Sequence, residues 1–269
     1  MQHTETHSDP LDPARAAAGL ITLGRAETVA QGGPLPLFFH HLYFWSPQPP
    51  EALGRDGHPR VGQGGLIPDM GLPRRMWAGG RLTFHQPLLA GQDAERRSVL
   101  EVSNTKQGRS GPLGFVTLRH DYHQGGRICV TEWQDLVYRE DPAPGVPPPV
   151  PLVARTDETE RRIVRFDSTL LFRYSALTFN GHRIHYDLDY AREVEGYAGL
   201  VVHGPLLAQL LMLFAQDLCG PVVRFSFRAT APLTHTETAE LCLKDQALWV
   251  RGPDGRQCME AQFRAISQA

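Results

Sequence analysis

The chain has 269 residues, of which 41% are hydrophobic and 21% charged, a balance typical of a globular protein and not of a disordered or fibrous one. The formal net charge of -2 leaves no overall positive field to attract a nucleic acid backbone. The four cysteines show no CxxC pair or other metal-ligand spacing, so we expect a reducing cytoplasm and no metal.

Neither the N-terminal segment nor the longest apolar stretch indicates a membrane protein. Met1 to Asp12 is polar and acidic, and lacks the basic and apolar regions of a secretory signal. The longest apolar stretch, Leu200 to Ala215, is interrupted by His203, Gly204 and Pro205, and it falls short of the roughly 20 clean apolar residues that a membrane span needs.

An aromatic segment, Phe38 to Trp45, precedes the first predicted strands. Packing in the core is its default interpretation, and lining an acyl pocket is the alternative. If the segment is extended, His40 and His41 point to opposite faces, which predicts that they do not share a metal ion.

Four segments of the first half mix β-branched and aromatic residues between turn signals, which predicts an antiparallel meander. They are Arg81 to Leu89, Arg96 to Thr105, Leu113 to His120 and Arg127 to Arg139. The helix candidates of this half are poorer. Leu11 to Val29 is amphipathic at best and Gly62 to Gly80 is rich in glycine and proline, so we expect a degenerate first half.

A proline-rich stretch, Asp141 to Pro151, indicates a boundary, because proline removes backbone donors and favours an extended spacer. We therefore expect an N-terminal half over 1–141, a linker over 142–151 and a C-terminal half over 152–269.

The C-terminal half contains the clearest helix, from Pro205 to about Cys219. Proline is favoured at the first helical position, and Gly220 with Pro221 stops the helix. Apolar residues cover most of its circumference, so a sheet must wrap it, which predicts an α+β fold. The strands that follow are predicted at Val222 to Pro232, Thr238 to Lys244, Ala247 to Arg251 and Arg256 to Ile266.

Two short matches suggest that the halves repeat. Arg-Leu-Thr-Phe at 81–84 is similar to Arg-Phe-Ser-Phe at 224–227, and Glu132-x-Gln134 is similar to Glu260-x-Gln262.

The segment before the helix carries the most specific pattern, Asn180-Gly-His-Arg-Ile-His185, followed by Asp187, Ala191 and Val202-His-Gly204. It resembles the hydratase 2, or MaoC-like, family of (R)-specific enoyl thioester hydratases. That motif has an acidic residue five positions before the histidine, where this chain has Asn180. The form with His182 and Arg183, together with Leu-Pro-Arg-Arg-Met-Trp-Ala-Gly-Gly at 72–80, is similar to the subgroup of 3-hydroxyacyl thioester dehydratases type 2 and mesaconyl-CoA or itaconyl-CoA hydratases.

The resemblance implies a double hot-dog fold, in which curved antiparallel sheet wraps a long helix in each of two repeats. It also implies addition of water to an enoyl thioester, which needs a base for the water, an acid at C2 and donors for the thioester oxygen. We expect His185 to be the base and Asn180 to position the water. The N–H of Gly204, in the first turn of the helix, would stabilise the thioester oxygen.

The substrate-binding candidates are Arg183, Tyr186, His182, Arg74 and Arg75. Arg183 could meet a carboxylate or phosphate, or serve an ion pair with Asp187 or Asp189. For Asn180 the alternative is a turn residue, and for His182 an orienting one.

We expect an acyl-CoA substrate and no cofactor, and a homodimer is left open. The relatives suggest a short branched dicarboxylic acyl-CoA or acyl chains on acyl carrier protein, and the residues do not choose between them. The rival functions are a hot-dog thioesterase and a non-catalytic module that binds acyl thioesters.

Overall fold

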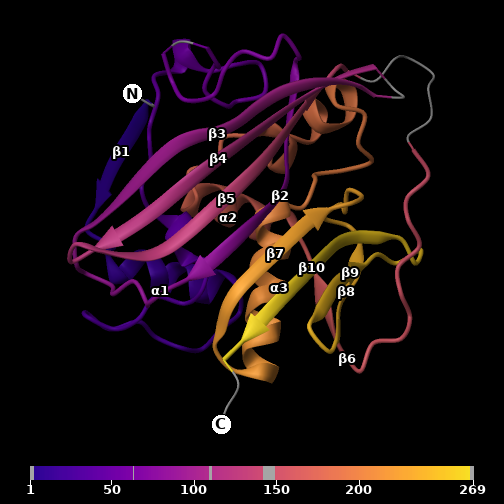
Figure 1. Ribbon diagram of the computed structural model, residues 1–269. Coiled ribbons are helices and arrows are strands. Elements are labelled where there is room, and N and C mark those ends of the chain that lie inside the picture. Colours follow the sequence, from indigo (N-terminus) through magenta and orange to yellow (C-terminus); the bar gives the residue numbers. More distant parts are fainter. Residues whose placement is uncertain (1–2, 63, 109–110, 142–148, 267–269) are drawn as a thin grey trace.

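The protein is described here by a computed structural model that covers residues 3–62, 64–108, 111–141 and 149–266 (Figure 1). Most of the predicted linker, 142–148, lies outside the described residues. Ten strands form one antiparallel sheet in the order β1-β3-β4-β5-β2-β7-β10-β9-β8-β6. The strands of the first half are β1 (Thr4–Asp9), β2 (Arg74–Phe84), β3 (Ala94–Gly108), β4 (Gly111–Gln124) and β5 (Arg127–Arg139). Those of the second half are β6 (Glu160–Arg165), β7 (Val222–Ala229), β8 (Thr238–Lys244), β9 (Ala247–Arg251) and β10 (Gln257–Ala265).

The two halves have the same topology. The order β1-β3-β4-β5-β2 of the first half is repeated as β6-β8-β9-β10-β7 in the second, and β2 pairs with β7 to join them. The predicted meander is wrong in one respect, because β2 pairs with β5 and β7 instead of with the next strand in the chain, β3. Alternating side chains identify a strand but do not say which neighbour it takes.

One of the two predicted repeats holds in space. The segments 81–84 and 224–227 lie in β2 and β7, at the seam, where Leu82 pairs with Phe225. The Glu-x-Gln match is wrong. If Leu82 and Phe225 are equivalent, then Glu132, which pairs with Leu82, corresponds to Phe263, which pairs with Phe225, and not to Glu260. Glu132 is therefore a buried acid of the first half alone.

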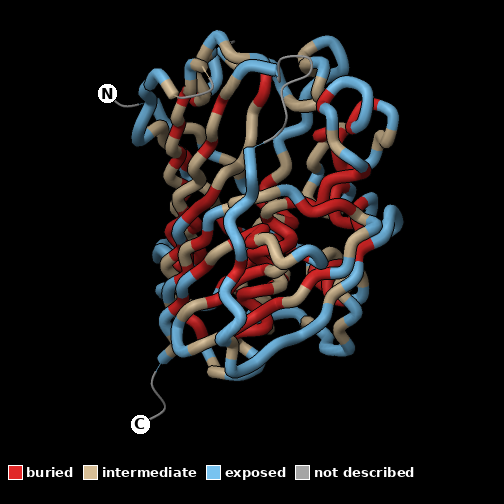
Figure 2. Tube along the Cα trace, turned by 90° about the vertical axis from the view of Figure 1, so that its right-hand side faces the viewer, coloured by how far each residue is buried: buried red, intermediate tan, exposed pale blue. Residues whose placement is uncertain are grey.

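The long helix α3 (Gly204–Cys219) lies against β7, β8, β9 and β10, as the sequence predicts. It begins one residue before Pro205 and ends at Cys219. The next residue, Gly220, caps the helix with a φ of 81°, which favours glycine. Most of its side chains are buried, including Leu206, Leu211 and Met212 at 0% exposure. Figure 2 shows this buried layer inside the curve of the sheet.

The first half has a shorter helix, as expected. The helix α1 (Pro13–Thr22) begins after Asp12, whose side chain accepts a hydrogen bond from the Ala14 N–H at 2.8 Å. It packs against α2 (Ser168–Leu177) and against the short 3-10 helix η1 (Phe39–Leu42). The aromatic segment thus occupies part of the space beside the first half of the sheet.

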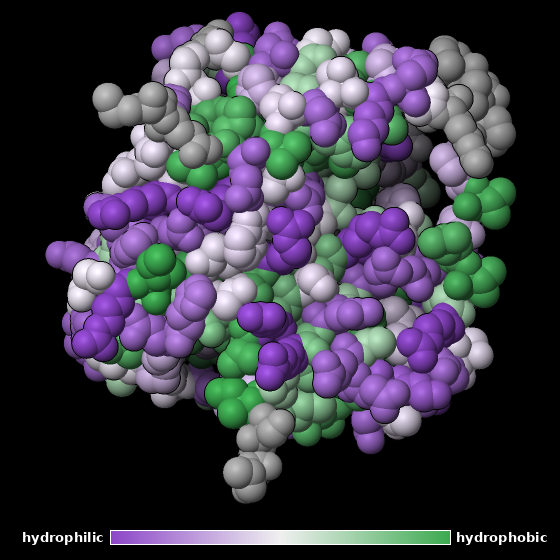
Figure 3. All heavy atoms as spheres, viewed as in Figure 1, coloured by the Kyte–Doolittle hydropathy of each residue, from purple (hydrophilic) through white to green (hydrophobic). Residues whose placement is uncertain are grey.

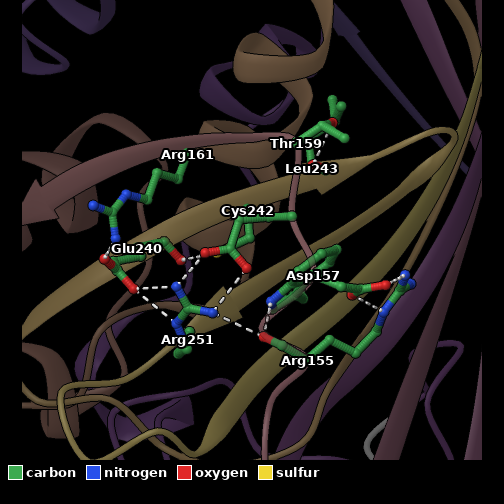
Figure 4. Close-up of polar contacts among 10 residues, drawn as sticks. Arg155, Asp157, Thr159, Arg161, Glu240, Cys242, Leu243 and Arg251 are labelled. Carbon is green, nitrogen blue, oxygen red and sulfur yellow. Dashed lines mark hydrogen bonds and ion pairs between the residues drawn. The ribbon is translucent and has the colours of Figure 1, made fainter.

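Arginine-centred ion pairs attach the start of the second half to its sheet (Figure 4). Arg251 on β9 donates to Glu158 at 2.5 and 2.9 Å and to Glu240 at 2.7 Å. Lys244 donates to Asp157 at 2.8 Å. The backbone before β6 is therefore held along the outer strands.

Hydrophilic side chains cover much of the face seen in Figure 3, with apolar ones scattered among them. Among the described residues, no helix is long and apolar enough to cross a membrane.

We expect Leu211→Ala to lower the free energy of unfolding by about 2 to 5 kcal/mol, because it removes a fully buried side chain from α3 and leaves a cavity. Leu218→Ala is the matched control, since Leu218 lies in the same helix but is 44% exposed. Urea denaturation of both variants measures the difference, and equal losses would show that α3 is not the centre of the core.

Candidate active site

A cavity of about 590 Å³ lies where the two halves meet. Its wall combines the aromatic segment and the loop that follows it, the sheet of the first half, and the stretch from α2 to the start of α3. The cavity is lined by, among others, His41, His58, Trp77, Arg96, Gln134, Tyr174, Ser175, Asn180, Tyr186 and Pro205. A volume of this order fits a small-molecule site, which usually has roughly 300 to 1,000 Å³.

His185 ends a 3-10 turn, Arg183–His185, next to this cavity. Its Nδ1 donates to the carbonyl oxygen of Val201 at 2.7 Å, which leaves Nε2 as the atom with a free lone pair. The side chain is 7% exposed and is not among the lining residues, and burial lowers its pKa to about 4. The His185 imidazole is therefore neutral at neutral pH, with an unprotonated Nε2.

His203 lies under His185, with ring centroids 3.6 Å apart and the rings stacked. It is completely buried, and its Nε2 lies 2.8 Å from the Oγ of Ser175. The neighbouring Tyr174 lines the cavity, and its buried hydroxyl has no hydrogen-bond partner among the described residues. A substrate oxygen would satisfy that hydroxyl, because a buried donor without a partner is costly.

Asn180 is a turn residue that also lines the cavity. Its Oδ1 accepts a hydrogen bond from the His182 N–H at 3.0 Å, which is the geometry of a turn residue. The residue also lines the cavity, where its amide NH₂ remains available as a donor. The backbone N–H of Asn180 closes the end of α2 on the Ser175 carbonyl at 2.8 Å.

Gly204 is the first residue of α3, and the cavity reaches the helix at the next residue, Pro205. A first-turn N–H has no partner within its own helix, so it can donate to an oxygen in the cavity. A Cβ at Gly204 would lie 3.7 Å from the Trp77 carbonyl oxygen, which is an ordinary contact. The structure thus gives no steric reason for a glycine here.

Arg183 and Tyr186 lie at the outer side of the same loop. The Arg183 guanidinium pairs with Asp187 at 2.7 Å and lies over the Tyr190 ring at 4.3 Å, which is the ion-pair alternative of the sequence. Tyr186 lines the cavity and donates its hydroxyl to the Gly181 carbonyl at 2.9 Å.

The other substrate-binding candidates lie away from the cavity lining. Arg74 is 6% exposed and pairs with the buried Glu195 at 2.6 Å, so its charge is already matched within the protein. Arg75 helps to lower the pKa of His58 and His182, although burial is the larger cause for both. It therefore lies within electrostatic range of the loop that carries His185.

The sequence did not single out Asp56 and His58. Nδ1 of His58 lies 2.9 Å from Oδ2 of Asp56, and His58 lines the cavity. The His58 and His182 rings are 4.5 Å apart. The only sequence signal is the Asp-Gly-His spacing in a loop, which is too short to be specific.

A second carboxylate lies in the core beside the cavity. Glu132 has 0% exposure, and it accepts hydrogen bonds from His40 at 3.2 Å, His41 at 2.8 Å and the Tyr122 hydroxyl at 2.9 Å. Burial opposes its ionisation, but the two histidines outweigh this and hold the pKa of Glu132 well below its usual range.

The prediction that His40 and His41 point to opposite faces is wrong. It assumed an extended segment, whereas Phe39–Leu42 is a 3-10 helix that brings both imidazoles to Glu132. By distance alone two trios among the described residues could hold a metal ion. They are His40, His41 and Glu132, and Asp56, His58 and His182. In each trio, hydrogen bonding between imidazole and carboxylate also explains why the groups lie close together.

Comparisons with known proteins agree with this arrangement. Residues 38–235 match the family model described as hydroxyacyl-thioester dehydratase type 2. The chain is 45% identical over 265 residues to the mesaconyl-C(4)-CoA hydratase of Chloroflexus aurantiacus, covering 96% of this chain and 94% of that one.

Two solved structures from Mycobacterium tuberculosis have the same fold. The protein HtdX matches with a TM-score of 0.68 at 20% identity, over 98% of this chain and 100% of that one. A conserved hypothetical protein described as having a double hotdog fold matches with a TM-score of 0.58 at 16% identity, over 98% and 96%. The predicted double hot-dog fold is thereby confirmed. The chain belongs to the hydroxyacyl-thioester dehydratase type 2 family, and it is a hydro-lyase.

Proposed function

We propose that the protein reversibly hydrates a short branched dicarboxylic enoyl-CoA, of the kind represented by mesaconyl-CoA and itaconyl-CoA. The mesaconyl-C(4)-CoA hydratase of Chloroflexus aurantiacus supports this, because the similarity extends over 96% of this chain. The observation that carries the proposal is the polar wall of the cavity, where a guanidinium faces the space that an acyl group would occupy.

That guanidinium belongs to Arg96 on β3. Among the described residues it forms no ion pair with a carboxylate; it contacts His7 Nδ1 at 3.4 Å, and it also interacts with the Tyr122 hydroxyl. His41 and Gln134 add polar atoms to the same wall. An unpaired guanidinium in a half-buried wall favours a ligand that carries a free carboxylate.

The reaction uses the groups around the His185 loop. Nε2 of His185 takes a proton from water as the water oxygen bonds to C3, and the electron pair of the C2=C3 bond moves towards C2 and the thioester oxygen. The proton then passes from His185 to C2, which restores the neutral imidazole. The N–H of Gly204 and the amide of Asn180 are the donors that stabilise the developing charge and orient the reactants.

The alternative substrate is a longer 3-hydroxyacyl chain on acyl carrier protein. The apolar side of the same cavity favours it, since Phe44, Trp45 and Phe172 also line the space. A free carboxylate would be absent from such a chain, so Arg96 distinguishes the two substrates.

We further propose that the protein works in the cytoplasm, and that the substrate is delivered as an acyl-CoA. The four cysteines support a reducing compartment, because all are free in the structure. A homodimer is the assembly to test by the mass of the protein in solution.

We expect the purified protein to hydrate mesaconyl-CoA, and His185→Ala to lower kcat/KM by about 10²-fold or more, since a general acid–base group contributes roughly 10² to 10⁴. Loss of the absorbance of the conjugated double bond measures the rate, and circular dichroism checks the fold. Turnover of the alanine variant at the wild-type rate would remove His185 from the mechanism.

Arg96→Met should lower kcat/KM for mesaconyl-CoA by about 10- to 100-fold, the loss expected for one hydrogen-bonded charge, and should leave crotonyl-CoA within a few-fold. Crotonyl-CoA is the matched control because it has no free carboxylate. A parallel loss on both thioesters would contradict the assignment of Arg96 to the substrate carboxylate.

Asn180→Ala should reduce turnover less than His185→Ala, because it removes one or two hydrogen bonds worth about 0.5 to 1.5 kcal/mol each and no proton-transfer group. Asn180→Asp serves as the control for the loop, since its carboxylate can still accept from the His182 N–H. Steady-state kinetics on one thioester compares the three variants. Equal losses from the two alanine variants would overturn this division of roles.

A further inference from the structure

The attacking water has two hydrogens, and Nε2 of His185 accepts only the one that is transferred. The amide oxygen of Asn180 already accepts the His182 N–H at 3.0 Å, which leaves it one lone pair and makes it a weaker acceptor than a free imidazole nitrogen. An imidazole with a free lone pair on the cavity wall would supply the second acceptor.

We infer that His58, held by Asp56, is a second catalytic residue of the hydration site, and that its Nε2 binds the other hydrogen of the attacking water. This inference rests on the proposed hydration. It assigns to the first half of the chain a group that touches the reacting water, although the motif that carries His185 lies entirely in the second half.

The hydrogen bond to Asp56 fixes which atom of His58 faces the water. Nδ1 lies 2.9 Å from Oδ2 of Asp56, and the backbone N–H of His58 donates to Oδ1 of the same carboxylate at 3.0 Å. The carboxylate therefore holds Nδ1 as the protonated nitrogen and leaves the lone pair on Nε2. Its negative charge also makes that nitrogen a stronger acceptor.

Backbone contacts fasten this pair to the loop that bears Asn180. The Arg183 N–H donates to the Asp56 carbonyl at 2.9 Å. Gly57 lies so close to Gly181 that a Cβ on Gly57 would be 2.1 Å from the Gly181 carbonyl oxygen, and the φ of Gly57 is +85°. The position of His58 is thus set by the same loop that sets Asn180 and His185.

The ring of His182 contacts the rings of both His58 and His185. The centroid of His182 is 4.5 Å from that of His58 and 5.4 Å from that of His185. Burial, assisted by Arg75, lowers the pKa of His58 to about 4, and the pKa of His185 is also lowered to about 4 by burial. Asp56, Arg75, Tyr174, Tyr186 and His182 are further titratable groups around this space, and the imidazoles of His58, His182 and His185 are all neutral at neutral pH.

With both acceptors in place the step balances without another reactant. One hydrogen of the water stays hydrogen-bonded to Nε2 of His58, while the other passes as a proton to Nε2 of His185 and the oxygen bonds to C3. The electron pair of the double bond forms the new bond at C2 with the proton that His185 returns. The product hydroxyl keeps the hydrogen that His58 holds, and both imidazoles end neutral.

The test compares His58→Ala, His58→Gln and Asp56→Asn with the wild-type enzyme on mesaconyl-CoA. We expect His58→Ala to lower kcat by about 10- to 100-fold, the loss of one strong hydrogen bond, with KM within about threefold of wild type. His58→Gln, whose amide oxygen is an acceptor, should recover part of that loss, and Asp56→Asn should fall between the two.

Added imidazole should restore turnover to His58→Ala by occupying the vacated space. His123→Ala is the control, since His123 lies on β4 outside the cavity lining and should keep wild-type kcat. Chelation with EDTA should change neither the wild type nor the variants.

Three results would overturn the inference. The first is a His58→Ala enzyme with wild-type kcat, or with a change in KM alone. The second is a loss that neither glutamine nor imidazole restores, which marks a structural role. The third is loss of wild-type activity in EDTA, which would mean that the imidazole binds a metal and not water. An inactive wild-type enzyme would instead defeat the proposed function, and this inference with it.

Discussion

The burial of α3 is the constraint on which the rest of the structure depends. Leu206, Leu211 and Met212 are fully buried, and apolar residues cover most of the circumference of α3. Exposing that surface to water would be unfavourable, so the sheet must curve around the helix. The residues just before the helix are then fixed at the rim of the sheet. Among them, Val201 supplies the carbonyl that orients His185, and His203 supplies the ring on which His185 stacks. Packing of the core thereby sets the tautomer and the direction of the proposed base.

Neither half of the chain completes the cavity alone. The pairing of β2 with β7 joins the two sheets at Leu82 and Phe225, and one hydrophobic core includes residues from both halves. A second junction lies at the site itself, where the Gly57 and Gly181 backbones touch. The two halves repeat each other in topology but not in side chains at the cavity, because the first contributes Arg96 and the His58–Asp56 pair and the second contributes the motif loop and the helix.

The sequence predicts best what depends on local pattern. The helix from Pro205 and seven of the eight predicted strand regions need only periodicity and turn residues to be placed close to their observed bounds. β1 and β6 escape prediction because they are polar edge strands without an apolar face. The pairing of β2 with β5 and β7, and the approach of Asp56 and His58 to the motif loop, depend on contacts between residues far apart in the chain, which periodicity does not encode.

The same limit explains the error at His40 and His41. Their neighbourhood is aromatic, and aromatic residues favour strands, but the partner that makes a 3-10 turn favourable is Glu132, about ninety residues later. A buried carboxylate needs donors, and two imidazoles from one turn can reach it together. Tertiary hydrogen bonding thus decides a local conformation that the segment alone leaves ambiguous.

The electrostatics of the cavity follow from the burial of its ionisable groups. Burial keeps His40, His58 and His185 neutral at neutral pH, since the pKa of each is lowered to about 4. The charge of Glu132 is stabilised by hydrogen-bond donors such as the Tyr122 hydroxyl. The cavity wall therefore carries the imidazole of His58 near the motif loop and the guanidinium of Arg96. A neutral imidazole can take up a proton and return it, which suits a reaction that must run in both directions. In the proposed reaction, Arg96 selects the charged acyl group, because it is a permanent cation among groups that burial keeps neutral.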